Sequence, residues 1–292
     1  MPRFPLLPFL LLAVLIGACW LPTATAHFKD AKIEIYQAIT IPIIDGTYNM
    51  TLNSVQIGGQ ERFVDEWNDA AWVQIPKRVG PTNVTAYSGY KYDSEFLYIA
   101  LDAPSATIFG QVSFATAFDP MHDGGTQQAK PDDFVVGSDW WPGSAYPFEM
   151  WMRYGSTDGS FGEKTPIPKE LVAEFGGKLK KSPTPILSTP HLFVELRIPL
   201  SIGGLSQRIN STVGIETELY MRDTQTDYIY PDLSGGYAFI PDNYADAVFS
   251  KSVNPNPTIP AIPEFPAGFV PLALFIVLGA VQIIVRRRRG KG

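Results

Sequence analysis

Apolar and polar side chains alternate with a period of two through the central part of this 292-residue chain, and no other feature limits its fold as strongly. Segment 191–200 places aliphatic side chains at every second position, and segments 148–154 and 215–221 alternate in the same way. A period of two is that of a β-strand with one buried face. Segment 96–101 is apolar on both faces, which is typical of a central strand.

Helical patterns are scarce beside these strands. The only segments that favour a short helix are 65–71 and 168–175, the second of which begins with Pro and ends at two glycines. Many short strands separated by Gly and Pro, in a chain with 13% aromatic residues, predict an all-β fold: an antiparallel β-sandwich of jelly-roll type. The sequence contains neither a phosphate-binding loop nor a G-x-G-x-x-G motif.

Charge is distributed unevenly along the chain. All 29 acidic residues but only 17 of the 23 basic residues lie within 27–268, which gives this part a net charge of −12. The remaining six basic residues lie at the two ends. An acidic body is the opposite of what a nucleic-acid-binding protein presents, so that class is excluded.

The N-terminal 26 residues have the features of a secretory signal peptide. Arg3 precedes an apolar run over 4–21, and Ala24-Thr25-Ala26 predicts cleavage before His27. Two alternatives are an uncleaved membrane anchor and a lipid on Cys19, which follows a lipobox-like sequence. Cys19 is the only cysteine, so the mature body contains no disulfide, and its core must supply the stability.

The C-terminal part predicts a membrane anchor. Segment 269–285 is an apolar run long enough for a single transmembrane helix, and four arginines follow directly, which assigns 286–292 to the cytoplasm. The body, 27–253, is then extracellular, and the proline-rich segment 254–268 forms a stalk. The end of the stalk, Pro263-Glu264-Phe265-Pro266, resembles the PEF-type sorting signals of archaeal surface proteins, which implies that an archaeosortase trims some such tails.

Five sequence blocks occur in the order found in one known group of modules. They are Ile44-Asp45-Gly46, segment 65–70, segment 91–100, Phe118-Asp119-Pro120 with Asp123-Gly124-Gly125, and segment 194–200. This ordered set resembles the family 9 carbohydrate-binding modules and the wider DOMON-like group. The chain departs from that pattern at 47–64, which separates the first two blocks. Either an inserted hairpin fills this interval, or residues 57–59 hold the corresponding turn.

The resemblance implies a non-catalytic protein that binds a glycan or another small extracellular ligand. A sugar-binding surface needs exposed aromatic faces flanked by polar groups. The candidates are Trp140, Trp141, Tyr146 and Trp151, and the alternative is that these side chains cap or pack the sandwich. Trp67 and Trp72 match positions that the family packs in its core, so we expect them to be structural. No protein partner is indicated.

Oxygen ligands for calcium are concentrated in one acidic segment. Asp119, Asp123, Asp132 and Asp133, with the turn at Gly124-Gly125, predict a structural Ca²⁺ site, as some related modules hold. The alternative is a solvated acidic loop. Three N-x-S/T sequons indicate glycosylation sites at Asn49, Asn83 and Asn210.

Catalysis has little support in the sequence. The three histidines show no metal-binding spacing, and there is no nucleophile elbow. A second hypothesis, implied by the DOMON-like resemblance, is an electron-transfer domain that binds haem b through residues among Met121, His122, Met150 and Met152. A third is a structural surface-layer or adhesion protein, for which an acidic body and a stalk suffice.

Overall fold

The computed structural model describes residues 31–79, 85–103, 110–124, 129–141, 148–167, 171, 175–231 and 239–257. These residues form mainly β-structure. The strands are β1 (Lys32–Gln37), β2 (Asn53–Ile57), β3 (Gln60–Val64), β4 (Ala71–Ile75), β5 (Lys77–Val79), β6 (Ala86–Tyr92), β7 (Phe96–Ala103), β8 (Val112–Asp119), β9 (Phe134–Trp140), β10 (Phe148–Tyr154), β11 (Thr165–Pro166), β12 (Gly176–Ser182), β13 (His191–Pro199), β14 (Thr212–Met221), β15 (Thr226–Tyr230) and β16 (Ala245–Val253). Three short 3₁₀ helices are η1 (Ile202–Arg208), η2 (Arg222–Thr224) and η3 (Pro241–Asn243).

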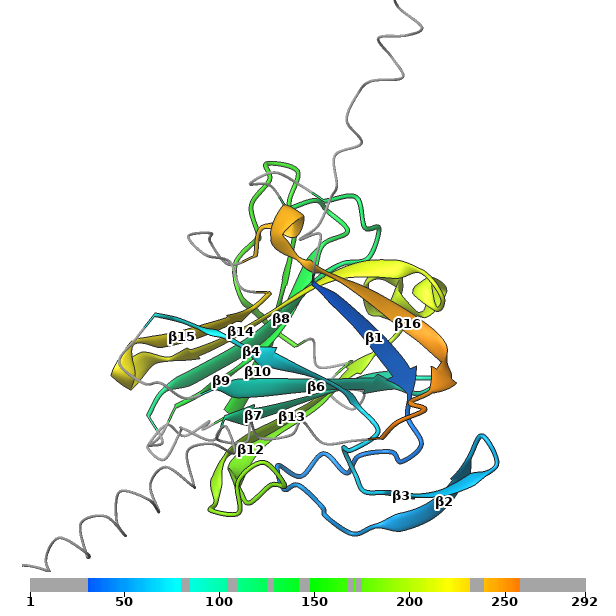
Figure 1. The fold of residues 1–292 in the computed structure, drawn as a ribbon. Helices are drawn as coiled ribbons and strands as arrows, with labels where there is room; N and C mark the ends of the chain where they lie inside the picture. Colours follow the sequence, from blue (N-terminus) through cyan, green and yellow to red (C-terminus); the bar gives the residue numbers. More distant parts are fainter. Residues whose placement is uncertain are drawn as a thin grey trace, which may run out of the picture.

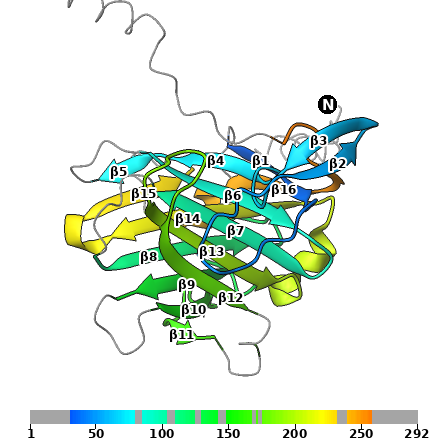
Figure 2. The same ribbon diagram turned by 90° about the horizontal axis from the view of Figure 1, so that it is seen from below.

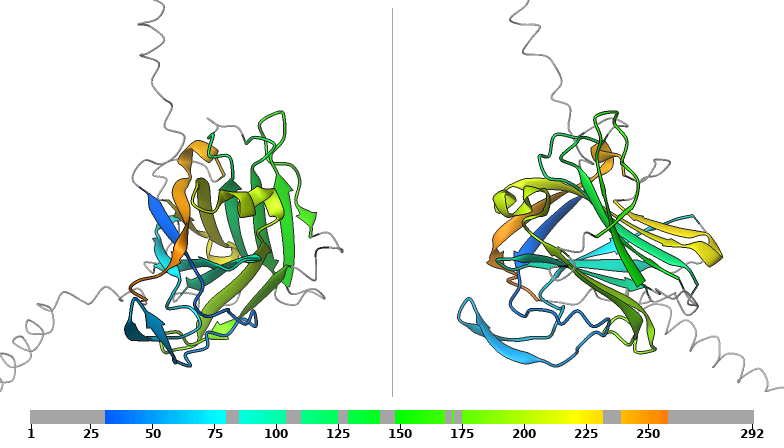
Figure 3. Two further views of the ribbon diagram at one scale, coloured as in Figure 1. Left: turned by 90° about the vertical axis from the view of Figure 1, so that its right-hand side faces the viewer. Right: turned by 180° about the vertical axis from the view of Figure 1, so that it is seen from behind.

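All the strands except β2 and β3 form one curled sheet that folds back on itself as a sandwich (Figures 1, 2 and 3). Its order is β11-β10-β9-β8-β14-β16-β1-β6-β7-β13-β12, with β15 beside β14 and β5, and β4 beside β6. The first layer therefore contains β8 to β11 and β14, and the second contains β6, β7, β12 and β13. Tyr90 in the second layer hydrogen-bonds Thr217 in the first, so the two layers face each other.

The predicted all-β class is confirmed, but the strands are not all antiparallel, as the predicted antiparallel sandwich would require. Most pairs are antiparallel, whereas β1 lies parallel to both β16 and β6 where the two layers join. β1 and β16 are about 200 residues apart in the chain. Strands so far apart need no hairpin between them, and an alternating pattern carries no information about strand direction.

The core between the layers is built from alternate side chains. Leu192, Val194, Leu196 and Ile198 of β13 are all buried in it, as the period of two predicts. β7 lies between β6 and β13, which confirms the expected central strand at 96–101. Phe193 and Glu195, on the other face of β13, are buried as well, because segment 38–50 and the turn at 65–70 cover this outer face.

Segment 65–70 forms a turn, so the helix expected over 65–71 is absent. The Asp65 carboxylate accepts hydrogen bonds from the backbone N–H groups of Trp67 and Asn68, at 2.9 and 2.8 Å. Short polar side chains that bond the backbone in this way compete with helix formation. Trp67 is fully buried, and the Nε1 of half-buried Trp72 donates to the Trp67 carbonyl at 2.9 Å, so both tryptophans are structural, as expected.

The interval at 47–64 contains an inserted hairpin. β2 and β3 form a separate two-stranded sheet, seen at the lower right of Figure 1. Gly58 and Gly59 make its turn with φ of 58° and 79°, a region that glycine adopts without strain. The hairpin alternative therefore holds for this interval, and the two glycines form the turn of that hairpin.

The predicted targeting segments lie outside the described residues. These are the signal peptide at 1–26 with Cys19, all but the start of the stalk at 254–268, the helix at 269–285 and the tail at 286–292. Among the residues that the structure describes, no helix has the length and apolar character needed to cross a bilayer. The predicted helix at 168–175 also lies mostly outside them.

Candidate functional site

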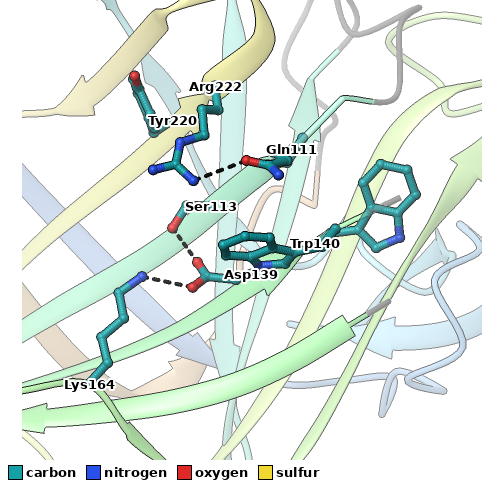
Figure 4. A pocket seen from close by; sticks show the side chains of 9 residues that line it. Gln111, Ser113, Asp139, Trp140, Lys164, Tyr220 and Arg222 are labelled. Atoms are coloured by element: carbon teal, nitrogen blue, oxygen red, sulfur yellow. Dashed lines mark hydrogen bonds and ion pairs between the residues drawn. The ribbon is translucent and has the colours of Figure 1, made fainter. Parts of the chain in front are cut away.

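A cleft of about 330 Å³ opens where three strands of the first layer end. The strand register places Tyr220 of β14, Ser113 of β8 and Asp139 of β9 in one row across the sheet. Side chains directly opposite each other share a face, so this row lies on the outer face of the layer. The cleft is lined by Gln111, Val112, Ser113, Asp139, Trp140, Trp141, Lys164, Tyr220 and Arg222 (Figure 4).

Two hydrogen-bonded groups hold the polar side chains of the cleft in place (Figure 4). The Asp139 carboxylate accepts from Ser113 Oγ at 2.6 Å and from Lys164 Nζ at 2.8 Å. Arg222 donates from Nη1 to Gln111 Oε1 at 3.0 Å, and its backbone N–H donates to the Gln111 carbonyl at 2.8 Å. These contacts fix donors and acceptors around the opening before any ligand arrives.

The two adjacent tryptophans differ in exposure and in the side of the cleft that they line. Trp140 lies opposite Val112 in the register, on the side of the sheet that faces the core, and is half-buried. Trp141 follows the end of β9 and is 40% exposed. The Arg222 guanidinium carbon lies 5.8 Å from the centre of the Trp141 ring. Trp141 therefore offers the open aromatic surface, while Trp140 closes the end of the sandwich and lines the cleft from within.

Trp151, expected to bind ligand, packs beneath the cleft instead. It is only 4% exposed, and its indole lies against Gly137, where an added Cβ would be 2.3 Å from the ring. Lys164 Nζ covers the ring at 4.1 Å from its centre. Gly137 on the adjacent strand has no side chain, so the indole lies against the sheet there. Because Lys164 covers the ring as well, no face of Trp151 is left for a sugar. Tyr146 lies outside the described residues.

Three of the four predicted calcium ligands converge at the far end of β8. The carboxylates of Asp119, Asp132 and Asp133 offer oxygen atoms within 4.8 Å of one another. Asp133 is fully buried, and its Oδ1 and Asp132 Oδ2 make no hydrogen bond. Burial, followed by the charges of the neighbouring carboxylates, raises the pKa of Asp133 to about 7. Asp123 stays outside this group, because its carboxylate pairs with Lys130 Nζ at 2.9 Å.

The residues of the haem hypothesis do not meet at one site. Met152 is buried in the core, and Met150 packs against it. The register aligns Met150 with Phe114, near the cleft end of β8, whereas His122 follows the other end of that strand. His122 Nε2 contacts Asp246 at 2.9 Å.

Of the polar residues that line the cleft, sequence reasoning missed Gln111, Ser113, Lys164, Tyr220 and Arg222. The alternation over 215–221 does place Tyr220 on the outer face of a strand. It gives no information about which strands lie beside it, and the row joins the consecutive strands β8 and β9 to β14, which is distant from both in the sequence.

Comparisons with known proteins find distant structural neighbours only. No family model matches the chain, and no curated protein matches it. Among solved structures, a family 9 carbohydrate-binding module from Caldicellulosiruptor kristjanssonii in complex with cellotriose shares 18% identity, over 80% of this chain and 100% of the module, with a TM-score of 0.47. A structure of such a module from the same organism with glucose shares 19% identity, over 75% and 96%, with a TM-score of 0.43. Similarity at this level is distant and assigns no function to this chain.

Proposed function

We propose that this protein is a non-catalytic glycan-binding protein of the cell surface and that the cleft beside Trp141 is its binding site. The observation that carries the proposal is the exposed Trp141 indole at the mouth of a cleft whose polar groups are already fixed. The C–H faces of pyranose rings pack on aromatic rings, and hydroxyl groups need such donors and acceptors. Asp139, Arg222 and Tyr220 supply them around the indole.

The shape of the cleft favours a short ligand. Its volume is at the lower end of the range for small-molecule sites. The half-buried Trp140 and the Lys164 side chain, which covers Trp151, bound the cleft from within. We therefore propose that it holds a short segment of a glycan, and not a long stretch of polymer.

The composition of the cleft supports binding without hydrolysis. Glycoside hydrolysis uses two carboxyl groups, one on each side of the scissile bond. Among the described residues that line the cleft, Asp139 is the one acidic side chain, and Ser113 and Lys164 already engage it. A carboxylate held in this way orients hydroxyl groups.

We further propose that Ca²⁺ binds Asp119, Asp132 and Asp133 and fixes the loop between β8 and β9. Calcium takes several oxygen ligands, and the unbonded oxygens of Asp132 and Asp133 are of the required kind. Asp119 lies seven positions along β8 from Val112 in the cleft, which is about 23 Å along a strand. The ion is therefore proposed to be structural, remote from the ligand.

The position of the cleft suits a surface protein that is anchored by its C-terminus. β16 runs antiparallel to β14 and passes beyond Thr212, at the N-terminal end of β14. Tyr220 lies near the opposite end of that strand, and Arg222 follows the strand directly. The chain therefore leaves β16 at the end of the sheet opposite to the cleft. Asn49 and Asn210 are exposed and are proposed glycosylation sites, and Asn83 lies outside the described residues.

The proposal is tested with a glycan array that is probed with the wild-type protein and two variants. We expect binding to a defined set of glycans, and we expect Trp141→Ala to lose it. Tyr154→Ala is the matched control, because Tyr154 is a 49% exposed aromatic residue at the opposite end of β10 from the cleft. The proposal fails if no glycan binds, or if both variants bind as the wild type does.

A further inference from the structure

The cleft carries more positive than negative charge, although the body of the protein is strongly acidic. Lys164 and Arg222 line it, and Asp139 is the one carboxylate among its described lining residues. Lys164 and Asp139 pair at 2.8 Å and neutralise each other. The remaining charge is that of the Arg222 guanidinium.

Arg222 is positioned by its neighbours and not neutralised by them. It is the first residue of η2, directly after β14, where two hydrogen bonds tie its backbone and its Nη1 to Gln111. A guanidinium group has five N–H donors in a planar fork. Within the described part of the chain, Arg222 forms no ion pair, and its hydrogen-bonding side-chain partner is Gln111. Most of the fork is therefore open to a ligand.

The exposed guanidinium also contacts the proposed sugar platform as a cation–π partner, with its carbon 5.8 Å from the centre of the Trp141 ring. In a uronic acid, the carboxylate is attached directly to the pyranose ring. A uronic acid ring packed on Trp141 therefore brings its carboxylate within reach of Arg222. The pairing of a guanidinium fork with a carboxylate is bidentate and charge-assisted, which makes it one of the stronger and more selective contacts in proteins.

From this arrangement we infer that the cleft selects acidic glycans, in which a uronic acid ring packs on Trp141 and its carboxylate binds Arg222. The inference rests on the proposed function and specifies its ligand. The net charge of −12 over 27–268 repels anions at long range, so an uncompensated cation in a preformed cleft acts as a local selectivity element.

The experiment measures the affinity of the full-length protein for trisaccharides of galacturonate and glucuronate, each as the free acid and as the methyl ester. The ester keeps the ring and removes the charge. For at least one of the two sugars, we expect the wild type to bind the acid at least about tenfold more tightly than its ester, and rising salt to weaken this preference. Arg222→Gln reduces the preference to near one, and Arg222→Lys retains part of it because it keeps the charge without the fork.

Lys178→Gln is the control, since it removes one positive charge from an exposed position on β12, away from the cleft. It is expected to keep the preference. Equal affinity for acid and ester, or an unchanged preference in Arg222→Gln, overturns the inference, even if Trp141-dependent binding of a neutral glycan upholds the proposed function. Tighter binding of a sulfated galactose trisaccharide than of either uronate overturns the assignment to a carboxylate. If no glycan binds in a Trp141-dependent manner, the proposed function and this inference both fail.

Discussion

Replacement of Lys91 by methionine tests how the second layer is held to the segment that covers it. Lys91 of β6 is fully buried, and its ammonium donates to the carbonyls of Thr40 and Glu66 and to Asp69 Oδ1, the last at 2.7 Å. Burial lowers the pKa of Lys91, and the charge of Asp69 opposes this shift. The substitution keeps the length of the side chain, but removes the cation and leaves the Asp69 carboxylate buried.

The size of the effect follows from what remains around Asp69. Loss of one partner of a buried ion pair typically costs about 3 to 5 kcal/mol. Asp69 Oδ2 keeps the backbone N–H donors of Ile39 and Thr40, at 2.6 and 3.2 Å, so we expect the lower end, about 3 kcal/mol. For a domain of this size, such a loss lowers the melting temperature by roughly 6 to 12 °C.

Thermal and urea unfolding of the wild type, Lys91→Met and an exposed control, Lys178→Met, measure this effect. We expect the control to change stability by less than about 0.5 kcal/mol. Adding Asp69→Asn to Lys91→Met is expected to recover part of the loss, because it removes the uncompensated buried charge. If Lys91→Met and the control unfold at the same temperature and urea concentration, the buried pair of Lys91 and Asp69 does not hold the covering segment to the second layer, and the reasoning is refuted.

Three further predictions concern the cleft, the calcium site and the pH dependence. Gly137→Ala places a Cβ 2.3 Å from the Trp151 ring and is expected to lower both the melting temperature and the glycan affinity. The control Gly162→Ala, whose nearest contact would be 3.6 Å, changes neither; equal effects of both variants argue against the packing of Trp151 under the cleft. Ca²⁺ is expected to raise the melting temperature of the wild type but not that of Asp133→Asn, measured against protein in chelator, and an equal shift in both contradicts the site. Burial raises the pKa of Glu195 from 4.5 to about 8, so its contribution to stability is full below about pH 4.5 and is lost as the pH rises through 8. Urea unfolding between pH 4.5 and 8.5 should therefore show a smaller decline for Glu195→Gln than for the wild type, and parallel curves would contradict the shift.

Sequence patterns predicted the strands of this fold better than their arrangement. The alternation at 191–200 and 148–154 corresponds to β13 and β10, because burial of one face of a strand leaves a local signal. The pairing of β1 with β16 leaves no such local signal in the sequence. The sequence also contains no sign that both faces of β13 are buried, since Glu195 in an alternating pattern predicts a solvent-facing side chain. In the structure it accepts hydrogen bonds from Trp67 Nε1 and the backbone of Asp45 and Gly46.

The candidate site shows the same division between local and non-local information. Trp141 was named as a candidate from the local sequence, because an aromatic pair in a segment flanked by glycines is conspicuous. Arg222 and Tyr220 were not found, because their relation to Trp141 depends on β14 lying beside β8, and β8 beside β9. Trp151 was misassigned because its burial depends on a glycine in the neighbouring strand, at Gly137.

The central claim, that a glycan binds beside Trp141, is tested most directly by following the indole N–H signals of the tryptophans by NMR while the tightest ligand from the array is added. Single Trp→Phe variants assign the signals. We predict that the Trp141 signal shifts most and that the Trp140 signal also shifts, with saturation at the affinity of the glycan. The buried Trp67 and half-buried Trp72 signals should stay in place. A ligand that saturates the protein without moving the Trp141 signal, or that moves Trp67 or Trp72 instead, would contradict the account.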